Sequence, residues 1–356
     1  MAPVVRELQA HSGSFEVRVA VTGQHREQLD QVLRVFGIVP DVDLDLMRHG
    51  QTLAQITTRA LEGLEAVVAR EEPAVVLAQG DTTTTFVAAL AAFYRKVPFG
   101  HVEAGLRTQD IYDPFPEEMN RRLAGAIARF HFAPTERARG NLLREGVPAE
   151  HIRVTGNTGI DALLSVAAQP HAFEDPVLRQ VVEGPARLVL VTAHRRENLG
   201  EPLGRICEAV ACLAAELDDC EFVFAMHRNP LVREQVRPIL EGRPRVRLVE
   251  PPDYAPFVKL MQRAALILSD SGGIQEEAPS LGVPVLVLRE TTERPEGVAA
   301  GVARLVGTRR ERVVAEARLL LTDAGARARM ARASNPYGDG HAAAAIRTAL
   351  EEEMPR

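Results

Sequence analysis

Cysteine is scarce in this 356-residue chain, and long apolar runs are missing from it. Three cysteines do not make the framework of a disulfide-stabilised domain. Cys207 and Cys212 fall in an apolar pattern of helical period, which favours core packing, and with Cys220 they lack the spacing and the fourth ligand of a metal site. No apolar stretch approaches the ~20 residues of a membrane span, and no signal peptide opens the sequence. We therefore expect a cytoplasmic protein without a metal site or a membrane partner.

A strong charge imbalance is also absent. The chain carries 42 lysines and arginines against 48 aspartates and glutamates, a net charge of −6, which gives no reason to expect a nucleic-acid partner. Hydrophobic residues make up 46% and charged residues 25%, as in a globular enzyme. A chain of 356 residues exceeds one small core, so two domains are expected. No internal repeat, low-complexity tract or redox-cofactor motif is present, and we expect no cofactor.

Apolar runs typical of strands alternate with helical patterns along most of the chain. The expected strands lie at 15–21, 74–78, 97–102, 130–133, 152–154, 188–192, 222–225, 246–249, 265–269, 283–288 and 303–306. Because most are continuously apolar, they indicate parallel sheets covered on both faces. We expect an α/β fold with two Rossmann-like domains facing each other across a cleft. The expected divisions are an N-terminal domain at 1–165, a C-terminal domain at 166–335, and a last helical segment at 336–356 that crosses back to the first domain.

The beginning of the chain departs from this pattern. A helix is expected at 1–9, whereas a sheet of this kind normally opens with a strand and a phosphate-facing loop. We therefore expect the first strand of the N-terminal domain to be missing, or the chain to begin at an internal methionine. A lost interior strand exposes apolar surface and unpaired backbone groups. The given chain is accordingly expected to be inactive or poorly folded, and an upstream extension to restore both properties.

Residues 266–277, LILSDSGGIQEE, combine a buried strand, a tight polar turn and the start of a helix. Gly272 and Gly273 let the backbone approach a ligand closely, and the helix behind them offers unpaired N–H groups that suit a phosphate. Ser271 adds a hydroxyl donor, and Glu277 can accept hydrogen bonds from sugar hydroxyls. Taken alone, the same string also fits an ordinary strand-to-helix turn.

Polar side chains follow the expected strands repeatedly. The residues in such positions are Asp81, Glu103, His194, His227 and Asp270 with Ser271. In open parallel sheets, ligands bind at that edge. Each residue alone could be a helix cap or a loop residue, but their corresponding positions in two domains favour a ligand site.

Three carboxylates and a basic segment carry the chemistry of the predicted site. Asp81, Glu103 and Glu117 come from successive elements, and carboxylates that share a dry site separate their pKa values into an acid and a base. Asp81 could instead cap a helix, and Glu117 could serve a helix dipole; Glu103 has no such structural role. The string TAHRREN (192–198) places basic side chains that could bind a diphosphate, or that could simply be exposed to solvent in a loop. The string TTERPE (291–296) brings further charged side chains to the same edge of the sheet.

Taken in order, these motifs resemble the non-hydrolysing UDP-N-acetylglucosamine 2-epimerases. The matching strings are TGQHRE (22–27), GDTTTT (80–85), HVEAGLRT (101–108), PFPEEMNR (114–121), TAHRREN (192–198), SDSGGIQEE (269–277), TERPEG (292–297) and NPYGDG (335–340). They span nearly the whole chain, and their combination is highly specific. The resemblance implies a GT-B-like fold and interconversion of UDP-GlcNAc and UDP-ManNAc. It also implies a homodimer, no nicotinamide cofactor and a role in cell-surface polysaccharide biosynthesis.

The resemblance also implies roles for individual residues. Asp81, Glu103 and Glu117 would be the acid/base carboxylates, and His194 would lie near the leaving diphosphate. The residues implied to hold UDP are His194, Ser271, Gly272, Gly273, Glu277 and Arg294. The implied mechanism is anti elimination of UDP across C1–C2, which gives 2-acetamidoglucal, followed by re-addition. Since no carbonyl acidifies the C2 hydrogen, stabilising the departing diphosphate becomes as important as the base.

Two departures from the family pattern affect these expectations. Family members carry a Gly-Thr-Arg-Pro-Glu loop and a lysine immediately before the position of Met1, and that loop supplies cationic groups at the nucleotide site. Members regulated by a second UDP-GlcNAc match this chain at Gln24, His25, Arg195 and His227. Some of them carry a glutamine at the position of Glu27 and an arginine at that of Gly50, where this chain differs.

The motifs leave more than one function open at this point. A GT-B glycosyltransferase that uses a UDP-sugar would share the fold and the nucleotide site, although the three carboxylates and the HVEAGLRT string argue against it. The sequence is also compatible with a nucleotide-sugar-binding protein without turnover and with a hydrolysing epimerase. The product formed from UDP-GlcNAc alone distinguishes these functions.

Overall fold

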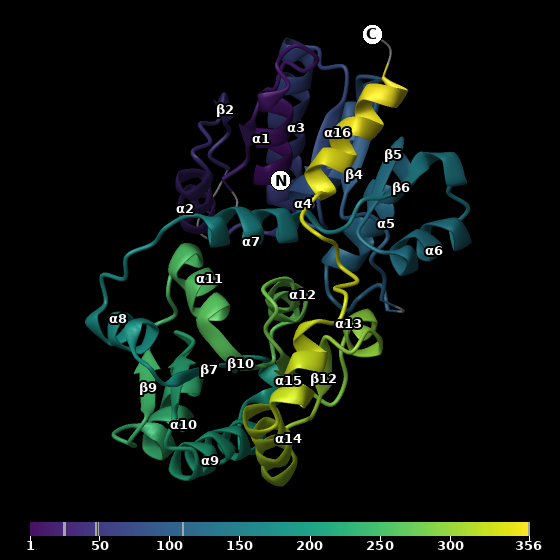
Figure 1. Ribbon diagram of the computed structural model, residues 1–356. Coiled ribbons are helices and arrows are strands. Elements are labelled where there is room, and N and C mark those ends of the chain that lie inside the picture. Colours follow the sequence, from purple (N-terminus) through teal and green to yellow (C-terminus); the bar gives the residue numbers. More distant parts are fainter. Residues whose placement is uncertain (24–25, 47, 49, 109, 355–356) are drawn as a thin grey trace. The chain divides into compact units, whose positions relative to one another are not determined.

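The computed structural model describes residues 1–23, 26–46, 48, 50–108 and 110–354. The chain divides into two compact units (Figure 1). Unit 1 consists of Met1–Ala162 and Tyr337–Arg356, and unit 2 consists of Leu163–Pro336. Among the described residues, no helix combines the length and the apolar character needed to cross a membrane.

Unit 1 contains a four-stranded parallel sheet of order β3-β4-β5-β6 and a separate parallel pair, β1-β2. The strands are β1 (Ala20–Val21), β2 (Val42–Asp43), β3 (Val76–Gln79), β4 (Phe99–Val102), β5 (Phe130–Ala133) and β6 (Ile152–Val154). The helices are α1 (Ala2–Ala10), α2 (Arg26–Phe36), α3 (Leu53–Glu71), α4 (Thr83–Tyr94), α5 (Glu117–Ile127), α6 (Glu136–Arg144), the 3₁₀ helix η1 (Ala149–His151), α7 (Thr158–Ala168), which continues into unit 2, and α16 (Ala342–Glu353).

The strands β3 to β6 lie within two residues of predicted ones, but the strand expected at 15–21 is largely wrong and β2 was not predicted. Only Ala20 and Val21 pair with β2, and the backbone hydrogen bonds that join the two segments run from Val19 to Thr22 and include none from the described residues 15–18. Phe15 and Val17 instead use their side chains to pack against the apolar cluster beneath α1. The apolar pattern that indicated a strand therefore reflects core packing rather than a backbone ladder.

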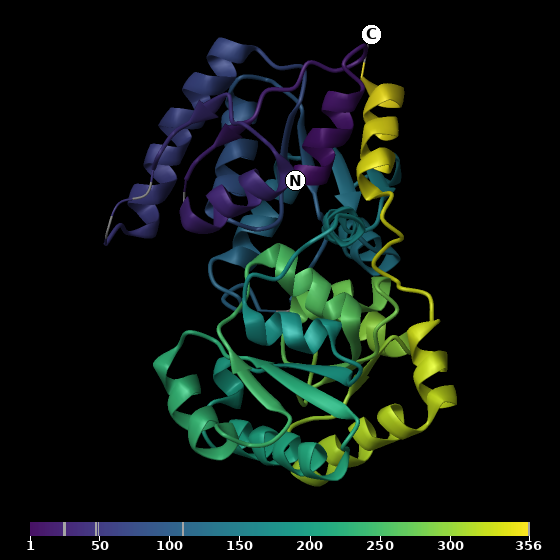
Figure 2. The ribbon, with the colours of Figure 1, turned by 60° about the vertical axis from the view of Figure 1, so that its left-hand side comes forward.

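The C-terminal helix belongs to unit 1. Asp161 accepts hydrogen bonds from the backbone N–H groups of Ala342 and Ala343, at 3.2 and 2.8 Å, and so holds the start of α16. Arg347 Nε pairs with Glu7 Oε1 of α1 at 2.9 Å. α16 lies beside α1 (Figure 2), and both helices contribute apolar side chains to the same cluster.

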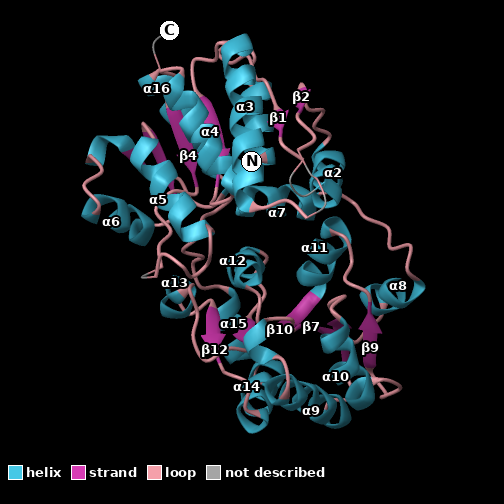
Figure 3. Ribbon diagram, turned by 180° about the vertical axis from the view of Figure 1, so that it is seen from behind, coloured by secondary structure: helices cyan, strands magenta, loops and turns pink. Residues whose placement is uncertain are grey.

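Unit 2 contains a six-stranded parallel sheet of order β12-β11-β10-β7-β8-β9. The strands are β7 (Arg187–Thr192), β8 (Cys220–Ala225), β9 (Val246–Val249), β10 (Ala264–Ser269), β11 (Val285–Val287) and β12 (Ala303–Leu305). The helices are α8 (Pro176–Glu183), the 3₁₀ helix η2 (Arg196–Asn198), α9 (Glu201–Glu216), α10 (Pro230–Leu240), α11 (Tyr254–Arg263), α12 (Gly272–Ser280), α13 (Pro295–Ala299), α14 (Arg310–Thr322) and α15 (Ala324–Ala331). Figure 3 distinguishes these strands from the helices around them.

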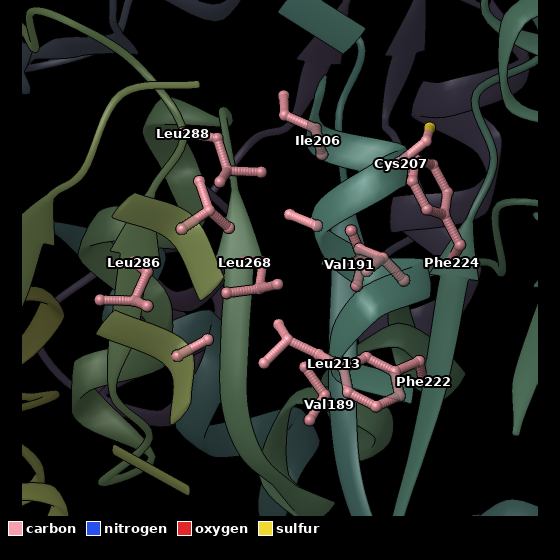
Figure 4. Packing of buried hydrophobic residues seen from close by; sticks show 14 of the residues in the cluster. Val189, Val191, Ile206, Cys207, Leu213, Phe222, Phe224, Leu268, Leu286 and Leu288 are labelled. Carbon is pink, nitrogen blue, oxygen red and sulfur yellow. The ribbon is translucent and has the colours of Figure 1, made fainter. Parts of the chain in front are cut away.

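The core of unit 2 lies between its sheet and α9, α10 and α14. Side chains of β7, β8 and β10 pack there with those of α9 (Figure 4). Alternate residues of the same strands are buried on the other face, where α11 and α12 contact the sheet. Cys207 is buried in this core and Cys212 packs against it, as the helical period predicted. Burial on both faces confirms the expected parallel α/β architecture.

Candidate functional site

Two of the predicted carboxylates follow neighbouring strands of unit 1. Gln79 of β3 pairs in register with Val102 of β4, so the segments carrying Asp81 and Glu103 leave the sheet side by side. A Cβ atom built on Gly80 would lie 3.3 Å from Glu103 Oε2, which means that this carboxylate passes directly over the Gly80 backbone. The structure therefore brings the two segments together, as the strand-end argument predicted.

Asp81 is held by side chains of α5. Arg121 donates to Asp81 Oδ2 from Nη2 at 2.6 Å and from Nε at 3.1 Å, and Asn120 Nδ2 donates to the Asp81 backbone carbonyl at 2.9 Å. The N-cap of α4 is Thr82, whose hydroxyl accepts from Thr85 N. Capping α4 is therefore not the role of Asp81, and its carboxylate is fixed by a guanidinium group.

The backbone around Glu103 is supported by a buried histidine. Glu103 adopts the left-handed conformation, with φ of 64°, which is uncommon outside glycine and is often found at functional sites. His101 Nε2 lies 2.7 Å from the carbonyl oxygen of Gly80. Because that oxygen only accepts, Nε2 carries the proton. Burial lowers the pKa of His101 to about 4, so the ring is neutral and ties the Gly80 turn to β4.

Adjacent glutamates at the start of α5 have different surroundings. Glu118 is fully buried, and its carboxylate accepts from Arg121 Nη1 and Arg122 Nε at 3.0 Å each and from Thr108 N at 3.1 Å. Glu117 is partly exposed, and within the described ranges its carboxylate has no hydrogen bond or ion pair. Glu118 and Arg121 were not predicted from the sequence, although their spacing of three residues on a helix was a usable signal.

In unit 2, Asp270 organises the segment that carries His194. Asp270 is fully buried, and its Oδ2 accepts from the backbone N–H groups of His194 and Arg195 and from Asn198 Nδ2, each at 2.9 Å. Its second oxygen, Oδ1, lies 3.3 Å from His194 Nδ1. Asp270 was predicted to lie at a strand end, without a role of its own. Its partners are more than seventy residues away along the chain, so only the fold reveals the contact.

The start of α12 presents backbone donors. Ser271 is the N-cap residue and makes no side-chain cap. In the described chain, the N–H groups of Gly272 and Gly273 have no protein acceptor. A Cβ on Gly272 would lie 2.9 Å from Glu293 Oε1 and 3.4 Å from Arg195 Nη2, so a basic side chain reaches this turn. Free N–H groups beside an arginine form an arrangement that suits a phosphate.

Glu277 belongs to α12, and Arg294 is hydrogen-bonded to the same helix. Burial, and then the charge of Glu276, raise the pKa of Glu277 to about 7, so this carboxyl exists in both protonation states near neutral pH. Burial, and then the charge of Glu277, raise the pKa of Tyr254 on α11. Arg294 Nε hydrogen-bonds Glu276 Oε1, and its loop is tied to α12 where the Thr292 hydroxyl donates to Gln275 Oε1 at 2.7 Å.

The residues expected to bind a second nucleotide sugar fall into two groups. Gln24 and His25 lie outside the described residues. The His227 ring stacks on that of His194, with centroids 5.3 Å apart and planes inclined by 13°. Arg195 Nη2 pairs with Glu293 Oε1 at 3.3 Å. These two residues therefore adjoin His194 and the start of α12. No group of three His, Cys, Asp or Glu side chains in the described ranges could hold a metal ion.

Comparison with known proteins gives matches over nearly the whole chain. The sequence model of the UDP-N-acetylglucosamine 2-epimerase family matches residues 6–351. The UDP-N-acetylglucosamine 2-epimerase of Salmonella typhimurium is 53% identical over 357 residues, which cover 99% of this chain and 94% of that protein.

Solved structures give the same result. The UDP-GlcNAc 2-epimerase of Neisseria meningitidis bound to UDP-GlcNAc matches with a TM-score of 0.86 and 46% identity, over 99% of this chain and 96% of that one. The enzyme of Methanocaldococcus jannaschii in complex with UDP-GlcNAc and UDP matches with a TM-score of 0.75 and 32% identity, over 99% and 95%. With the two parallel sheets, these matches confirm the expected GT-B-like fold class.

Proposed function

The chain belongs to the UDP-N-acetylglucosamine 2-epimerase family and is therefore an isomerase, and from this premise we propose how it interconverts UDP-GlcNAc and UDP-ManNAc. UDP leaves across C1–C2 in an anti elimination that gives 2-acetamidoglucal. Re-addition of UDP, with the C2 proton delivered to the opposite face, completes the epimerisation. The carboxylate arrangement in unit 1 carries this proposal, because the reaction must move a proton at a carbon that no carbonyl activates.

The carboxylates Asp81, Glu103 and Glu117 are proposed to remove and return the C2 proton. The support is that Asp81 and Glu103 leave adjacent strand ends and that Arg121 holds Asp81 in one orientation. The carboxylate of Glu117 makes no hydrogen bond or ion pair among the described residues, which leaves it available to a substrate. Fixed carboxylates lower the barrier to proton transfer by general acid–base catalysis.

Unit 2 is proposed to bind the UDP moiety. The N–H groups of Gly272 and Gly273, with the Ser271 hydroxyl, would donate to the diphosphate, and His194 would assist its departure. Glu277 would accept hydrogen bonds from ribose hydroxyls, and Arg294 would add positive charge nearby. Donors aimed at the charge that develops on a leaving group stabilise the transition state more than the ground state.

Assembly, location and regulation form a further part of the proposal. The enzyme would act in the cytoplasm as a homodimer and supply UDP-ManNAc for cell-surface polysaccharide. A second UDP-GlcNAc bound by Gln24, His25, Arg195 and His227 would regulate it, supported by the stacking of His227 on His194. A sigmoidal dependence of rate on UDP-GlcNAc that becomes hyperbolic in His227→Ala would support this regulation, and a hyperbolic wild-type curve would contradict it.

Incubating the purified protein with UDP-GlcNAc alone tests the proposed reaction. An epimerase gives UDP-ManNAc at equilibrium with its substrate. Release of free ManNAc and UDP would instead identify a hydrolysing relative. Formation of neither product would identify a transferase that lacks its acceptor, or a nucleotide-sugar-binding protein.

A further inference from the structure

The strongest unassigned feature is the carboxylate of Asp270. It lies at the end of β10, is fully buried, and directs Oδ2 at three N–H donors. One of these donors, Asn198 Nδ2, also donates to the carbonyl of Leu288 at 3.1 Å, so the donor itself is fixed from a second direction. Three donors on one oxygen fix the position of the whole carboxylate.

The second oxygen of Asp270 has no such set of partners. Oδ1 is buried and has no hydrogen-bond partner of good geometry among the described residues. The ionisable ring of His194 approaches it, with Nδ1 3.3 Å away. A carboxylate that faces one nitrogen of an imidazole sets which ring nitrogen carries the proton. A small rotation of the ring would turn this approach into a hydrogen bond.

The charges around His194 explain why this contact is important. Burial lowers the pKa of His194, and the neighbouring His227 and Arg195 lower it further, whereas Asp270 raises it. Among these neighbours, Asp270 is thus the group that favours the protonated form of the ring. Without this carboxylate, a partly buried histidine next to a histidine and an arginine would hold a proton poorly.

We infer that Asp270 is a positioning residue that keeps the Nδ1–H of His194 toward its Oδ1, so that Nε2 can give a proton to the departing diphosphate and take it back. The inference rests on the proposed elimination. The C2–H electron pair forms the C1=C2 bond, and the C1–O bond breaks with its electron pair left on the phosphate oxygen. That oxygen takes the proton from Nε2, and the C2 proton goes to a carboxylate. Re-addition reverses each transfer.

The substitution Asp270→Asn tests this role without removing the loop contacts. The amide oxygen can replace Oδ2 and accept from the same three donors, while the amide nitrogen presents N–H to His194 Nδ1 and so favours the wrong tautomer. The expected result is a fall in kcat of roughly 10²–10⁴-fold, with a much smaller change in KM for UDP-GlcNAc. Asn198→Ala is the matched control, since it removes one donor to Oδ2 but leaves the Asp270–His194 contact. Its kcat is expected to stay within about tenfold of wild type.

A double-substitution cycle separates positioning from a structural role. If Asp270 acts through His194, adding Asp270→Asn to His194→Ala lowers kcat by less than about threefold. If the fall in kcat of the double variant equals the product of the two single falls, the inference is overturned. Nitrogen NMR of the UDP complex gives a second readout, with Nδ1 protonated in wild type and Nε2 protonated in neutral His194 of Asp270→Asn. An unchanged tautomer would also overturn it. The tautomer measurement does not depend on whether wild type forms UDP-ManNAc, which is the test of the proposed function.

Discussion

At the scale of single residues, the adjacent glutamates Glu117 and Glu118 have different roles. Glu118 neutralises Arg121 and Arg122 inside unit 1, and Arg121 in turn holds Asp81. Glu117, one position earlier, takes no part in that network. The buried glutamate therefore stabilises the carboxylate arrangement, and the partly exposed Glu117 is available for chemistry.

This difference predicts opposite outcomes for two adjacent substitutions. Glu117→Gln should lower kcat by roughly 10²–10⁴-fold and leave thermal melting unchanged, because only a proton-transfer group is lost. Glu118→Ala should lower the free energy of unfolding by about 3 kcal/mol, because it removes a fully buried carboxylate that accepts hydrogen bonds from Arg121, Arg122 and the backbone N–H of Thr108. Melting curves and steady-state rates measure both effects. Near wild-type turnover by Glu117→Gln would remove this residue from the proposed mechanism.

Site residues could be predicted from the sequence only where neighbouring positions in the chain mark them. Asp81, Glu103 and His194 could be predicted as site residues because each lies within a few positions of the end of an apolar strand run. The partners that orient them could not, since Arg121 lies forty positions from Asp81, and Asp270 lies seventy-six from His194. Only the register of the sheets brings such pairs together.

At the scale of elements, the two glycines at the start of α12 differ in the space around them. A Cβ on Gly273 would meet no atom within 4 Å, whereas one on Gly272 would meet Glu293 Oε1 at 2.9 Å. Gly273→Ala should therefore melt at or slightly above the wild-type temperature, yet bind UDP at least about tenfold more weakly, because the methyl group occupies the approach of the diphosphate. Calorimetric titration with UDP measures this effect.

The matched substitution Gly272→Ala should perturb the free protein as well. Its Cβ displaces the Glu293 carboxylate that pairs with Arg195, so a lower melting temperature is expected. Unchanged UDP affinity in Gly273→Ala would show that the nucleotide does not approach this turn.

The β4–β5 pair contains a buried pH-sensitive element. His101 and His131 face each other in register, and burial lowers the pKa of each to about 4. An unfolded histidine titrates near 6.5, so between about pH 6.5 and pH 4 the unfolded chain binds more protons. The free energy of unfolding therefore falls as the pH is lowered through this window, by about 3 kcal/mol for each histidine at its lower end.

Substitution of His131 tests this dependence. Between pH 7 and pH 5, His131→Gln should lose ~2 kcal/mol less stability than wild type, because one of the two titrations is removed. Urea unfolding at both pH values measures the difference. The exposed His171 supplies the control, since His171→Gln is expected to keep the wild-type profile. Parallel profiles for His131→Gln and wild type would show that His131 is not buried in its neutral form.

A helix could be predicted where apolar residues of helical period follow a capping residue. Thr52 is the N-cap of α3 and forms a capping box with Gln55, a signal for a helix start that can be read from the sequence. The prediction of a strand at 15–21 was largely wrong because an apolar pattern indicates which side chains are buried, not which backbone groups form hydrogen bonds. Strand pairing depends on a partner segment, and the backbone hydrogen bonds to the segment around β2 begin only at Val19.

At the scale of the whole molecule, exposed aromatic residues support the proposed homodimer. Phe93 and Tyr94 at the end of α4 are 61% and 59% exposed. Large exposed apolar side chains in one place often mark an interaction surface. Light scattering should therefore give about twice the chain mass of 38.9 kDa, and Phe93→Asp should shift it toward a single chain. A single-chain mass for the wild-type protein would contradict the homodimer.

The central claim concerns the whole reaction, in which carboxylates of unit 1 move the C2 proton while unit 2 holds the departing UDP. Turnover of UDP-GlcNAc in D₂O, followed by proton NMR, tests it most directly. Side-chain acids exchange with solvent, so deuterium is predicted at C2 of UDP-ManNAc and, after multiple turnovers, at C2 of UDP-GlcNAc as well. UDP-ManNAc that keeps protium at C2 through many turnovers would contradict the claim.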